Sequence, residues 1–324
     1  MKKLTATLAA LLLAACAAEV DPAQKYRDAL PKAQSVVLET YQTEGATAGA
    51  LSVSRQPLGD SDILQSEYAV MSYYLALSVN GGAGLMLNLV QFITTFPTST
   101  CDDTSCTWGP WVGDQGWNNY KLVVTKDGAA YVYALSGKPA SILDAPFVDI
   151  LTGTAYPVDR DHGSGTFTLD FDAQDALDHG PAYEKKDFGQ LVVNYDNTGN
   201  PTVGALFIGA RNSDPANPHF MNAAYSFEDA TSGGQLQVAF ENLDTTETLT
   251  LRTRWSASGQ GRADVVFTAA GGASFTASEC WAGRSQDFVE VYDTKHLDNP
   301  LLQDASACSP FSTFQEADIS LPQG

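Results

Sequence analysis

Residues 119–135 read NYKLVVTKDGAAYVYAL, and this stretch decides the fold class. Segments 119–125 and 130–135 are rich in β-branched and aromatic residues, and the pair Asp127-Gly128 lies between them. An Asp-Gly pair in that position is a strong signal for a two-residue type I′ turn, because glycine adopts a positive φ without strain. The stretch therefore predicts a β-hairpin.

Similar turn signals separate alternating segments through most of the chain. Residues 196–200 and 232–234 consist mainly of the Asp, Asn, Ser and Gly residues that turns prefer. Consecutive hairpins of this kind predict an antiparallel meander of about eleven strands. The remaining strand-like segments are 146–151, 167–171, 191–195, 203–208, 220–227, 236–240, 249–255, 265–268, 275–280 and 288–292.

The segment at about 61–96 has the spacing of a helix instead. Asp60 or Ser61 is suited to cap its start, Pro97 ends it, and Asn-Gly-Gly at 80–82 interrupts it. The spacing predicts a hairpin or a kinked pair of helices. The apolar residues at helical intervals are Leu64, Tyr68, Met71 and Leu75, then Leu85, Leu89, Phe92 and Phe96.

No charged residue occurs from Tyr68 to Cys101, so a transmembrane helix is an alternative to a buried one. Asn80, Asn88 and Gln91 favour burial inside the protein, because polar side chains are costly in lipid. We therefore expect this segment to cover the apolar face of the sheet.

The expected fold is mainly β (α+β): a large curled antiparallel meander sheet, or partly open barrel, packed over one or two apolar helices. A transmembrane β-barrel is the rival architecture, since its strands alternate in the same way. Charged residues on the alternate strand positions argue against that rival: Asp170, Arg252, Arg254, Asp264 and Glu290. Residues 35–324 are expected to form a single β-rich domain.

Before this domain, residues 16–34 are expected to serve as anchor and linker. Asp21 and Pro22 suit the first positions of a short helix that runs to about Leu30. Residues 35–41, with Val36 and Val37, suggest a strand.

The first sixteen residues have the three parts of an export signal. Lys2 and Lys3 supply positive charge, residues 4–13 are mostly apolar, and Leu-Ala-Ala at 13–15 precedes Cys16. This order resembles the lipobox of bacterial lipoproteins. The resemblance implies that residues 1–15 are a lipoprotein signal peptide, removed by cleavage before Cys16, and that Cys16 carries several acyl chains.

The resemblance also implies a location in the cell envelope. Two or more acyl chains make a stable membrane anchor, whereas one binds only marginally. Ala17 follows Cys16, and in Gram-negative lipoproteins a residue other than aspartate there resembles the default signal for the outer membrane. The alternative is an ordinary cleaved signal in which Cys16 is incidental.

The composition excludes one class of partner. The chain carries a formal net charge of −20, and such an acidic surface repels nucleic acid. Its hydrophobic content is 44% and its charged content is 17%, which is typical of a globular protein rather than a disordered one.

The five cysteines agree with export. With Cys16 in the anchor, Cys101, Cys106, Cys280 and Cys308 remain, and an oxidising compartment favours two disulfides with three possible pairings. Proximity in the sequence favours Cys101–Cys106 and Cys280–Cys308. A four-thiolate zinc site is the rival, but only the first pair has the short spacing that such sites use.

No specific catalytic motif occurs, and the protein is not expected to be an enzyme. The four histidines form no HExxH motif. His-Gly-Ser-Gly at 162–165 differs from a hydrolase nucleophile elbow, which needs glycine two residues before and after the serine. We interpret it as a turn, and a hydrolase with a dispersed site is the least supported function.

Two further groups suggest binding. Asp159, Asp161, Asp170 and Asp172 are weak candidates for a calcium site, although their positions also suit turns and helix caps. Calcium is the only cofactor that the sequence suggests. Trp108, Trp111 and Trp117 form an aromatic group, which either binds a partner or lines the core.

Three fragments, together with the lipobox, resemble a group of envelope lipoproteins of myxobacterial type. The fragments are residues 108–111 (WGPW), 170–172 (DFD) and 279–281 (ECW). The resemblance implies a single domain and a disulfide at Cys280, and it implies no activity.

These observations predict a lipid-anchored envelope protein with a non-enzymatic binding or structural role, whose partner is another envelope protein. The alternative is a carrier that holds a lipid or acyl chain between the sheet and the helices.

Overall fold

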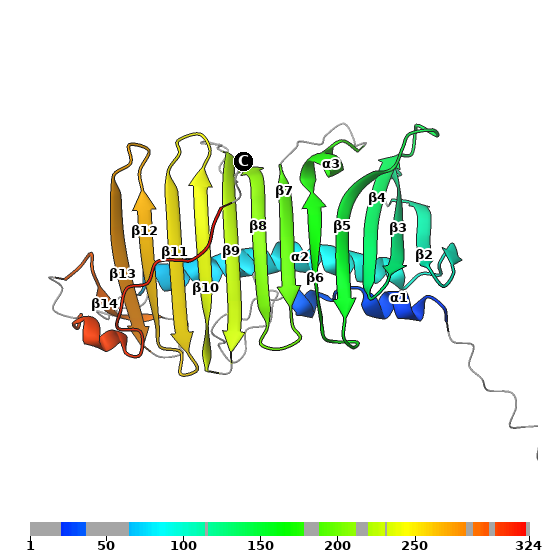
Figure 1. Cartoon of the computed structure of the whole chain (residues 1–324). Helices are drawn as coiled ribbons and strands as arrows, with labels where there is room; N and C mark the ends of the chain where they lie inside the picture. Colours follow the sequence, from blue (N-terminus) through cyan, green and yellow to red (C-terminus); the bar gives the residue numbers. More distant parts are fainter. Residues whose placement is uncertain are drawn as a thin grey trace, which may run out of the picture.

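The computed structural model describes residues 21–36, 65–113, 116–177, 188–211, 220–230, 232–282, 288–297 and 302–321. Within these residues one antiparallel sheet of fourteen strands dominates the molecule (Figure 1). Each strand pairs with its neighbours in the sequence, and the sheet does not close, because β1 and β14 are its two edges. The predicted open meander is therefore confirmed. Cys16, Asp60 and Ser61 lie outside the described residues.

The fourteen strands are short and regular. The first seven are β1 (Thr100–Cys101), β2 (Ser105–Val112), β3 (Asn118–Asp127), β4 (Ala130–Pro139), β5 (Val148–Pro157), β6 (Gly163–Asp170) and β7 (Gln190–Asp196). The others are β8 (Thr202–Arg211), β9 (Phe220–Ala230), β10 (Gly233–Asn242), β11 (Thr248–Ser256), β12 (Gly261–Thr268), β13 (Ser274–Ala282) and β14 (Val289–Asp293).

Turn chemistry sets the register of the β3–β4 hairpin as the sequence predicts. Asp127 lies opposite Ala130, and Leu122 lies opposite Leu135. Gly128 in the turn has a φ of +61°.

The prediction of about eleven strands missed β1 and β2. The first has only two residues, and Gly109-Pro110 breaks the alternation in the second.

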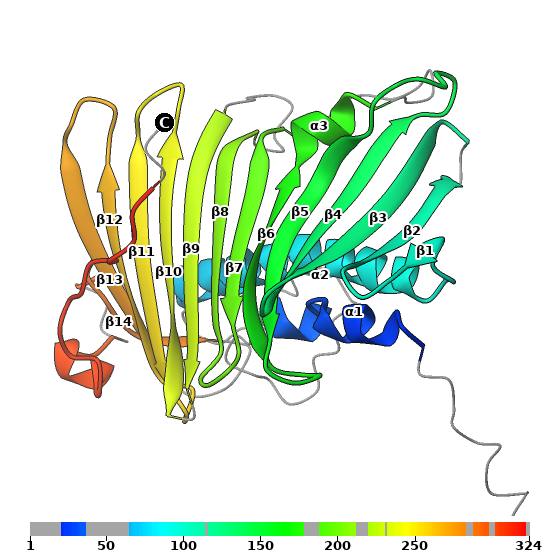
Figure 2. The same cartoon turned by 45° about the vertical axis from the view of Figure 1, so that its right-hand side comes forward.

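Among the described residues, one long helix, α2 (Glu67–Thr94), crosses one face of the sheet (Figures 1 and 2). Its 28 residues span roughly 42 Å at 1.5 Å per residue. The predicted interruption at residues 80–82 is wrong, because the helix continues through them. Glycine inside a helix costs only about 1 kcal/mol relative to alanine, and both halves of α2 are held against the protein. No described helix is long and apolar enough to cross a membrane.

The core lies between α2 and the inner face of the sheet. Leu87 and Val90 of α2 are completely buried, as are Leu122 and Leu251 of the strands. Burying a leucine or valine side chain contributes roughly 1.5–3 kcal/mol. The buried helix that the sequence predicted to cover the sheet is therefore present.

Two short helices lie before α2. Helix α1 (Gln24–Ala29) confirms a helix ending near Leu30, but its N-cap is Ala23 rather than the predicted Asp21. Its Arg27 Nε donates to the carbonyl of Thr94 at 2.6 Å. The 3₁₀ helix η1 (Ala33–Val36) occupies the start of the predicted strand at 35–41, so that prediction is wrong there, and residues 37–41 lie outside the described part. Val36 is buried in the core in helical form.

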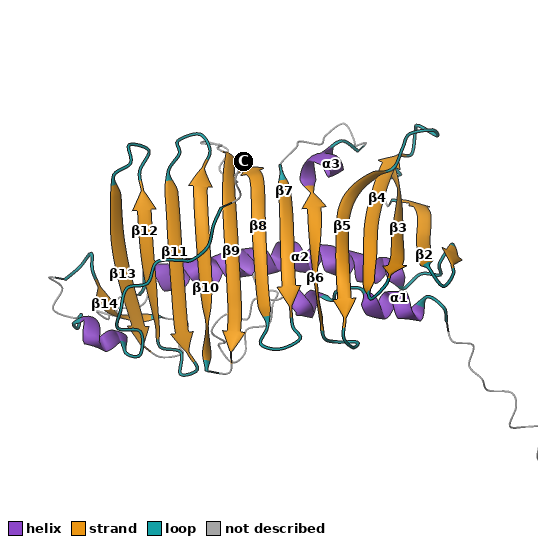
Figure 3. Cartoon of the chain, in the orientation of Figure 1, coloured by secondary structure: helices purple, strands orange, loops and turns teal. Residues whose placement is uncertain are grey.

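The C-terminal segment covers part of the opposite, outer face. After β14 the chain forms the 3₁₀ helix η2 (Ala305–Cys308) and then crosses the outer face over β13 to β10 as an irregular tail (Figures 1 and 3). The backbone nitrogen of Asp318 donates to Gln237 of β10 at 2.6 Å. A third short helix, α3 (Phe171–Asp175), follows β6 at the end of the sheet.

Candidate functional site

Charged side chains gather on the inner face at the β13–β14 edge, beside the start of α2. We call Glu279, Glu290, Asp293, Lys295 and His296 the edge cluster. Glu279 lies opposite Asp293 in the β13–β14 register, so both side chains point to the same face. The register shifts between Cys280 and Trp281, and Trp281 then lies opposite Glu290, which brings Glu290 to that face as well.

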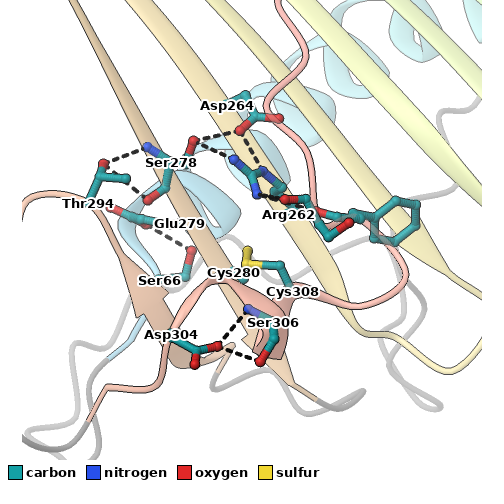
Figure 4. Close-up of a disulfide and its surroundings, with 12 residues drawn as sticks. Ser66, Arg262, Asp264, Ser278, Glu279, Cys280, Thr294, Asp304, Ser306 and Cys308 are labelled. Atoms are coloured by element: carbon teal, nitrogen blue, oxygen red, sulfur yellow. Dashed lines mark hydrogen bonds and ion pairs between the residues drawn. A yellow bond between two sulfur atoms is a disulfide. The ribbon is translucent and has the colours of Figure 1, made fainter. Parts of the chain in front are cut away.

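Glu279 joins this edge to the first turn of α2. Its carboxylate is completely buried and accepts a hydrogen bond from Ser66 Oγ at 2.9 Å (Figure 4). It also accepts one from the Tyr68 backbone nitrogen at 3.0 Å. The N-terminus of a helix carries partial positive charge, which favours a carboxylate there. Lys295 Nζ lies 2.8 Å from the other oxygen of Glu279. This helix-capping carboxylate is therefore well compensated.

Glu290 is buried without such compensation. Its exposed fraction is 8%, and within the described residues its carboxylate forms no hydrogen bond or ion pair. Burial, followed by the negative charges of Glu279 and Asp293, raises the pKa of Glu290 to about 7, even though His296 and Lys295 act in the opposite direction. A large fraction of Glu290 is therefore protonated near neutral pH.

Asp293 and His296 complete a set of donor atoms around Glu290. Asp293 is 1% exposed, and its Oδ2 lies 2.6 Å from Nδ1 of His296. One donor atom each of Glu290, Asp293 and His296 lies within 4.8 Å of the others. Two carboxylates and an imidazole are a ligand set that divalent zinc-like ions accept.

A second charged cluster lies on the outer face under the C-terminal tail. Asp264 of β12 is 1% exposed and accepts from Arg254 Nη2 at 2.7 Å and Arg262 Nε at 2.6 Å. Ser278 Oγ also donates to it at 2.6 Å (Figure 4). One carboxylate is thus saturated by charged and hydroxyl donors, as a buried ion needs.

This outer cluster fastens the tail. Arg254 donates to the carbonyl of Thr313 at 2.9 Å, and Arg262 donates to that of Ser312 at 3.2 Å. The backbone nitrogen of Gln315 donates back to Asp264 at 3.0 Å. These contacts join the tail to β11 and β12, so we assign this cluster a structural role.

Both predicted disulfides are present. Cys101 lies opposite Cys106 in the β1–β2 pair and is bonded to it. Cys280 of β13 is bonded to Cys308 of η2, which holds the start of the tail against the outer face (Figure 4). The rival four-thiolate zinc site is wrong, because all four sulfurs are used in these bonds.

The four predicted calcium ligands do not meet in one site. Asp159 and Asp161 lie in the β5–β6 turn, whereas Asp170 and Asp172 lie at the far end of β6. Eight residues of strand separate the pairs by roughly 25 Å. The calcium site formed by these four aspartates is therefore ruled out by the length of β6.

Each aspartate instead has a local role. Asp159 accepts from the backbone nitrogens of Asp161 and His162 at 2.8 Å, and the first of these bonds is the main reason why the pKa of Asp159 is lowered. Asp161 pairs with Lys32. Asp170 caps α3 by accepting from the Ala173 nitrogen at 2.7 Å, and Asp172 accepts from the Gly189 nitrogen at 3.2 Å.

The structure also places the three tryptophans and the His-Gly-Ser-Gly motif. Trp108 is buried and donates to the carbonyl of Phe96 at 3.2 Å, and Trp111 packs against the core, whereas Trp117 is 40% exposed. Residues 163–165 begin β6, after the turn that contains His162. His179 and His219 lie outside the described residues.

The outer face of β3 to β8 is free of charge at its centre. The cross-strand register places two rows of six residues there, on the side opposite the core. The described tail does not reach them (Figure 1). We call them the threonine–valine face: Thr125, Val132, Thr154, Thr166, Asn194 and Gly204, beside Val123, Ala134, Thr152, Thr168, Val192 and Leu206.

No known protein family, curated protein or solved structure matches this chain.

Sequence reasoning missed the edge cluster. Glu290, Asp293 and His296 follow a regular three-residue spacing, which is a signal that sequence can offer. Glu290 was instead expected on the polar face, because strict alternation ignores the shift in register at Trp281.

Proposed function

We propose that this protein is a lipid-anchored protein of the cell envelope, held at the outer membrane through Cys16. Its role is to bind another envelope protein on the threonine–valine face, without catalysis. The observation that carries the binding role is an uncharged sheet face on a protein with a net charge of −20. The largest exposed apolar patch on a monomer is often functional, and valine, leucine and threonine methyl groups give this face an apolar character.

The chemistry of this face suits a protein partner. Val132 is 43% exposed, and Thr152 and Asn194 are also exposed. Threonine and valine combine an apolar surface with few flexible bonds, so covering them costs little side-chain entropy. Twelve positions at about 4.8 Å between strands and 6.8 Å along them cover roughly 400 Å². That area is about half of one side of a standard interface.

The lipid anchor would hold the domain close to the membrane. Five residues at about 3.4 Å each reach roughly 17 Å from Cys16 to Asp21. Asp21 pairs with Arg27 of α1, and Tyr26 donates from its hydroxyl to the carbonyl of Asp102 at 3.1 Å. The chain after the anchor is thus fixed to the domain at α1. The sheet would then have little freedom relative to the bilayer.

Site-specific photo-crosslinking in living cells tests the binding role. A photoreactive residue at Val132 should give a discrete crosslinked protein, and one at Leu143, which is 85% exposed in the β4–β5 connection, should not. Thr154→Arg, which lies directly opposite Val132, should abolish the crosslink while the fold is retained. Equal crosslinking at both positions, or a crosslink that survives Thr154→Arg, would contradict the proposal.

A carrier of a lipid or acyl chain stays the alternative function. Native mass spectrometry of the purified full chain distinguishes it, because a carrier releases an added lipid mass on denaturation.

A further inference from the structure

We propose that Glu290, Asp293 and His296 bind a divalent transition-metal ion of the zinc class at the β13–β14 edge. The inference does not depend on the lipid anchor or on the threonine–valine face. It rests on the arrangement of the three donor groups and on the unpartnered, buried carboxylate of Glu290.

The three donors come from one short piece of chain. Glu290 and Asp293 lie in β14, and His296 lies three residues beyond Asp293. Their donor atoms lie within 4.8 Å of one another, whereas ligands on a tetrahedral zinc at about 2.1 Å lie roughly 3.4 Å apart. Side-chain rotation would have to bring the three donor atoms closer together, and an ion would replace the 2.6 Å contact between Asp293 Oδ2 and His296 Nδ1.

Glu290 supplies the second, independent observation. The residue as a whole is 8% exposed, and no described residue donates a hydrogen bond to its carboxylate, whose oxygens keep some contact with solvent. A buried polar group without a partner is costly, and a buried carboxylate is especially so. One carboxylate oxygen of Glu290 lies within 4.8 Å of donor atoms of both Asp293 and His296. A metal ion there would supply the interaction that this carboxylate lacks.

The charges of the edge cluster also favour a bound cation. Glu279, Glu290 and Asp293 bring three carboxylates to one buried edge. Among the described residues, Lys295 is the one lysine or arginine that pairs with them, and it is shared, because its Nζ also lies 3.0 Å from the exposed Glu67. A divalent ion would neutralise the remaining negative charge. Lys295 and Glu279 would then stay paired behind the metal ligands.

The donor set selects the class of ion. Calcium and magnesium prefer oxygen ligands only, whereas an imidazole nitrogen suits zinc and its first-row neighbours. Three protein ligands leave at least one position for water on a tetrahedral ion. The His296 side chain is 57% exposed, so an ion can reach the site from solvent.

Zinc binding by the full chain tests the inference. The protein, purified in detergent and stripped with EDTA, is dialysed against ZnCl₂ at micromolar free zinc, and bound zinc per chain is counted. We expect one zinc per chain. Glu290→Gln and His296→Asn should each weaken binding by roughly tenfold or more. Excess calcium should not compete.

A matched control separates this site from exposed histidine–aspartate pairs in general. His162 lies 2.9 Å from Asp159 in an exposed pair, and both side chains are more than half exposed, so His162→Asn should leave zinc binding unchanged. Glu290→Gln keeps the shape and removes a repelling charge, so it should fold, and circular dichroism checks this.

X-ray absorption of the bound zinc gives an independent result, with nitrogen and oxygen ligands and no sulfur expected. Wild-type protein that binds less than one zinc would overturn the inference. Equal zinc binding by the wild-type protein and Glu290→Gln would also overturn the inference.

Discussion

The carboxylate of Glu279 lies 3.0 Å from the backbone nitrogen of Tyr68, and this contact ties β13 to the first turn of α2 across 211 positions of sequence. The helix thus starts at a fixed point of the sheet. At its other end, Arg27 of α1 donates to the carbonyl of Thr94 in the last residue of the helix. The two contacts hold a 28-residue helix against one face.

Glu279→Gln tests the importance of this cap. The amide keeps the shape but loses the negative charge that faces the helix N-terminus and Lys295. We expect the free energy of unfolding to fall by about 1–3 kcal/mol. Glu67→Gln is the control, because Glu67 pairs with the same Lys295 but is 75% exposed, and it should change stability by less than about 1 kcal/mol. If urea denaturation shows the same loss of stability for Glu279→Gln and Glu67→Gln, Glu279 does not have the proposed capping role.

Asp264→Asn tests the outer cluster. The substitution leaves the guanidinium groups of Arg254 and Arg262 buried without their carboxylate. Breaking a buried pair in this way costs about 3–5 kcal/mol. We also expect the tail after Cys308 to become sensitive to proteases, which limited proteolysis with mass spectrometry detects. A tail that stays protected would show that Asp264 does not fasten it.

Removal of the Cys280–Cys308 disulfide tests how the tail is held. In the chain-entropy description, a bond between residues 28 positions apart stabilises the folded state by about 3–4 kcal/mol. The Cys280→Ser, Cys308→Ser double variant should lose most of this. The Cys101–Cys106 bond closes a loop of only 5 residues, and its removal should cost about 2 kcal/mol. The comparison needs thermal or urea unfolding under oxidising conditions.

The pH dependence of stability reports on Glu290. Its pKa is about 7 in the folded protein, against a reference value of 4.5 for the exposed group. Between these values the folded state keeps a proton that the unfolded chain loses. The stabilisation is therefore complete below about pH 4.5 and is lost as the pH rises to 7.

The size of this effect is reduced by partial solvent access to the cluster. We expect a loss on the order of 1–3 kcal/mol from pH 4.5 to 7 in metal-free protein. Other groups titrate in the same range, so the informative quantity is the difference between wild type and Glu290→Gln. Parallel stability curves for the two proteins would contradict the raised pKa.

The sheet could be predicted from the sequence because turns and strand alternation depend on residues that lie close together in the chain. Asp127-Gly128 sets a turn, and the alternation on each side of it selects the buried face. The pairing of Cys280 with Cys308 followed from proximity in the same way. Features of this kind need no knowledge of distant residues.

The continuity of α2 and the edge cluster could not be predicted in this way. The glycines at 81 and 82 interrupt a helix on local propensity, but packing of both flanks against the protein overrides that preference. Glu279 meets Tyr68 only because the sheet is complete, and Glu290 reaches the inner face only through the shift in register at Trp281. Both depend on contacts far apart in the sequence.

The most direct test of the proposed function is the chemical state of the mature N-terminus. The protein is extracted from membranes of cells that produce the full chain, digested, and its N-terminal peptide is weighed by mass spectrometry. The account predicts a peptide that begins at Cys16 and carries acyl chains, and predicts that Cys16→Ala moves the protein out of the membrane fraction. A mature chain that begins elsewhere, or that contains an unmodified Cys16, would contradict it.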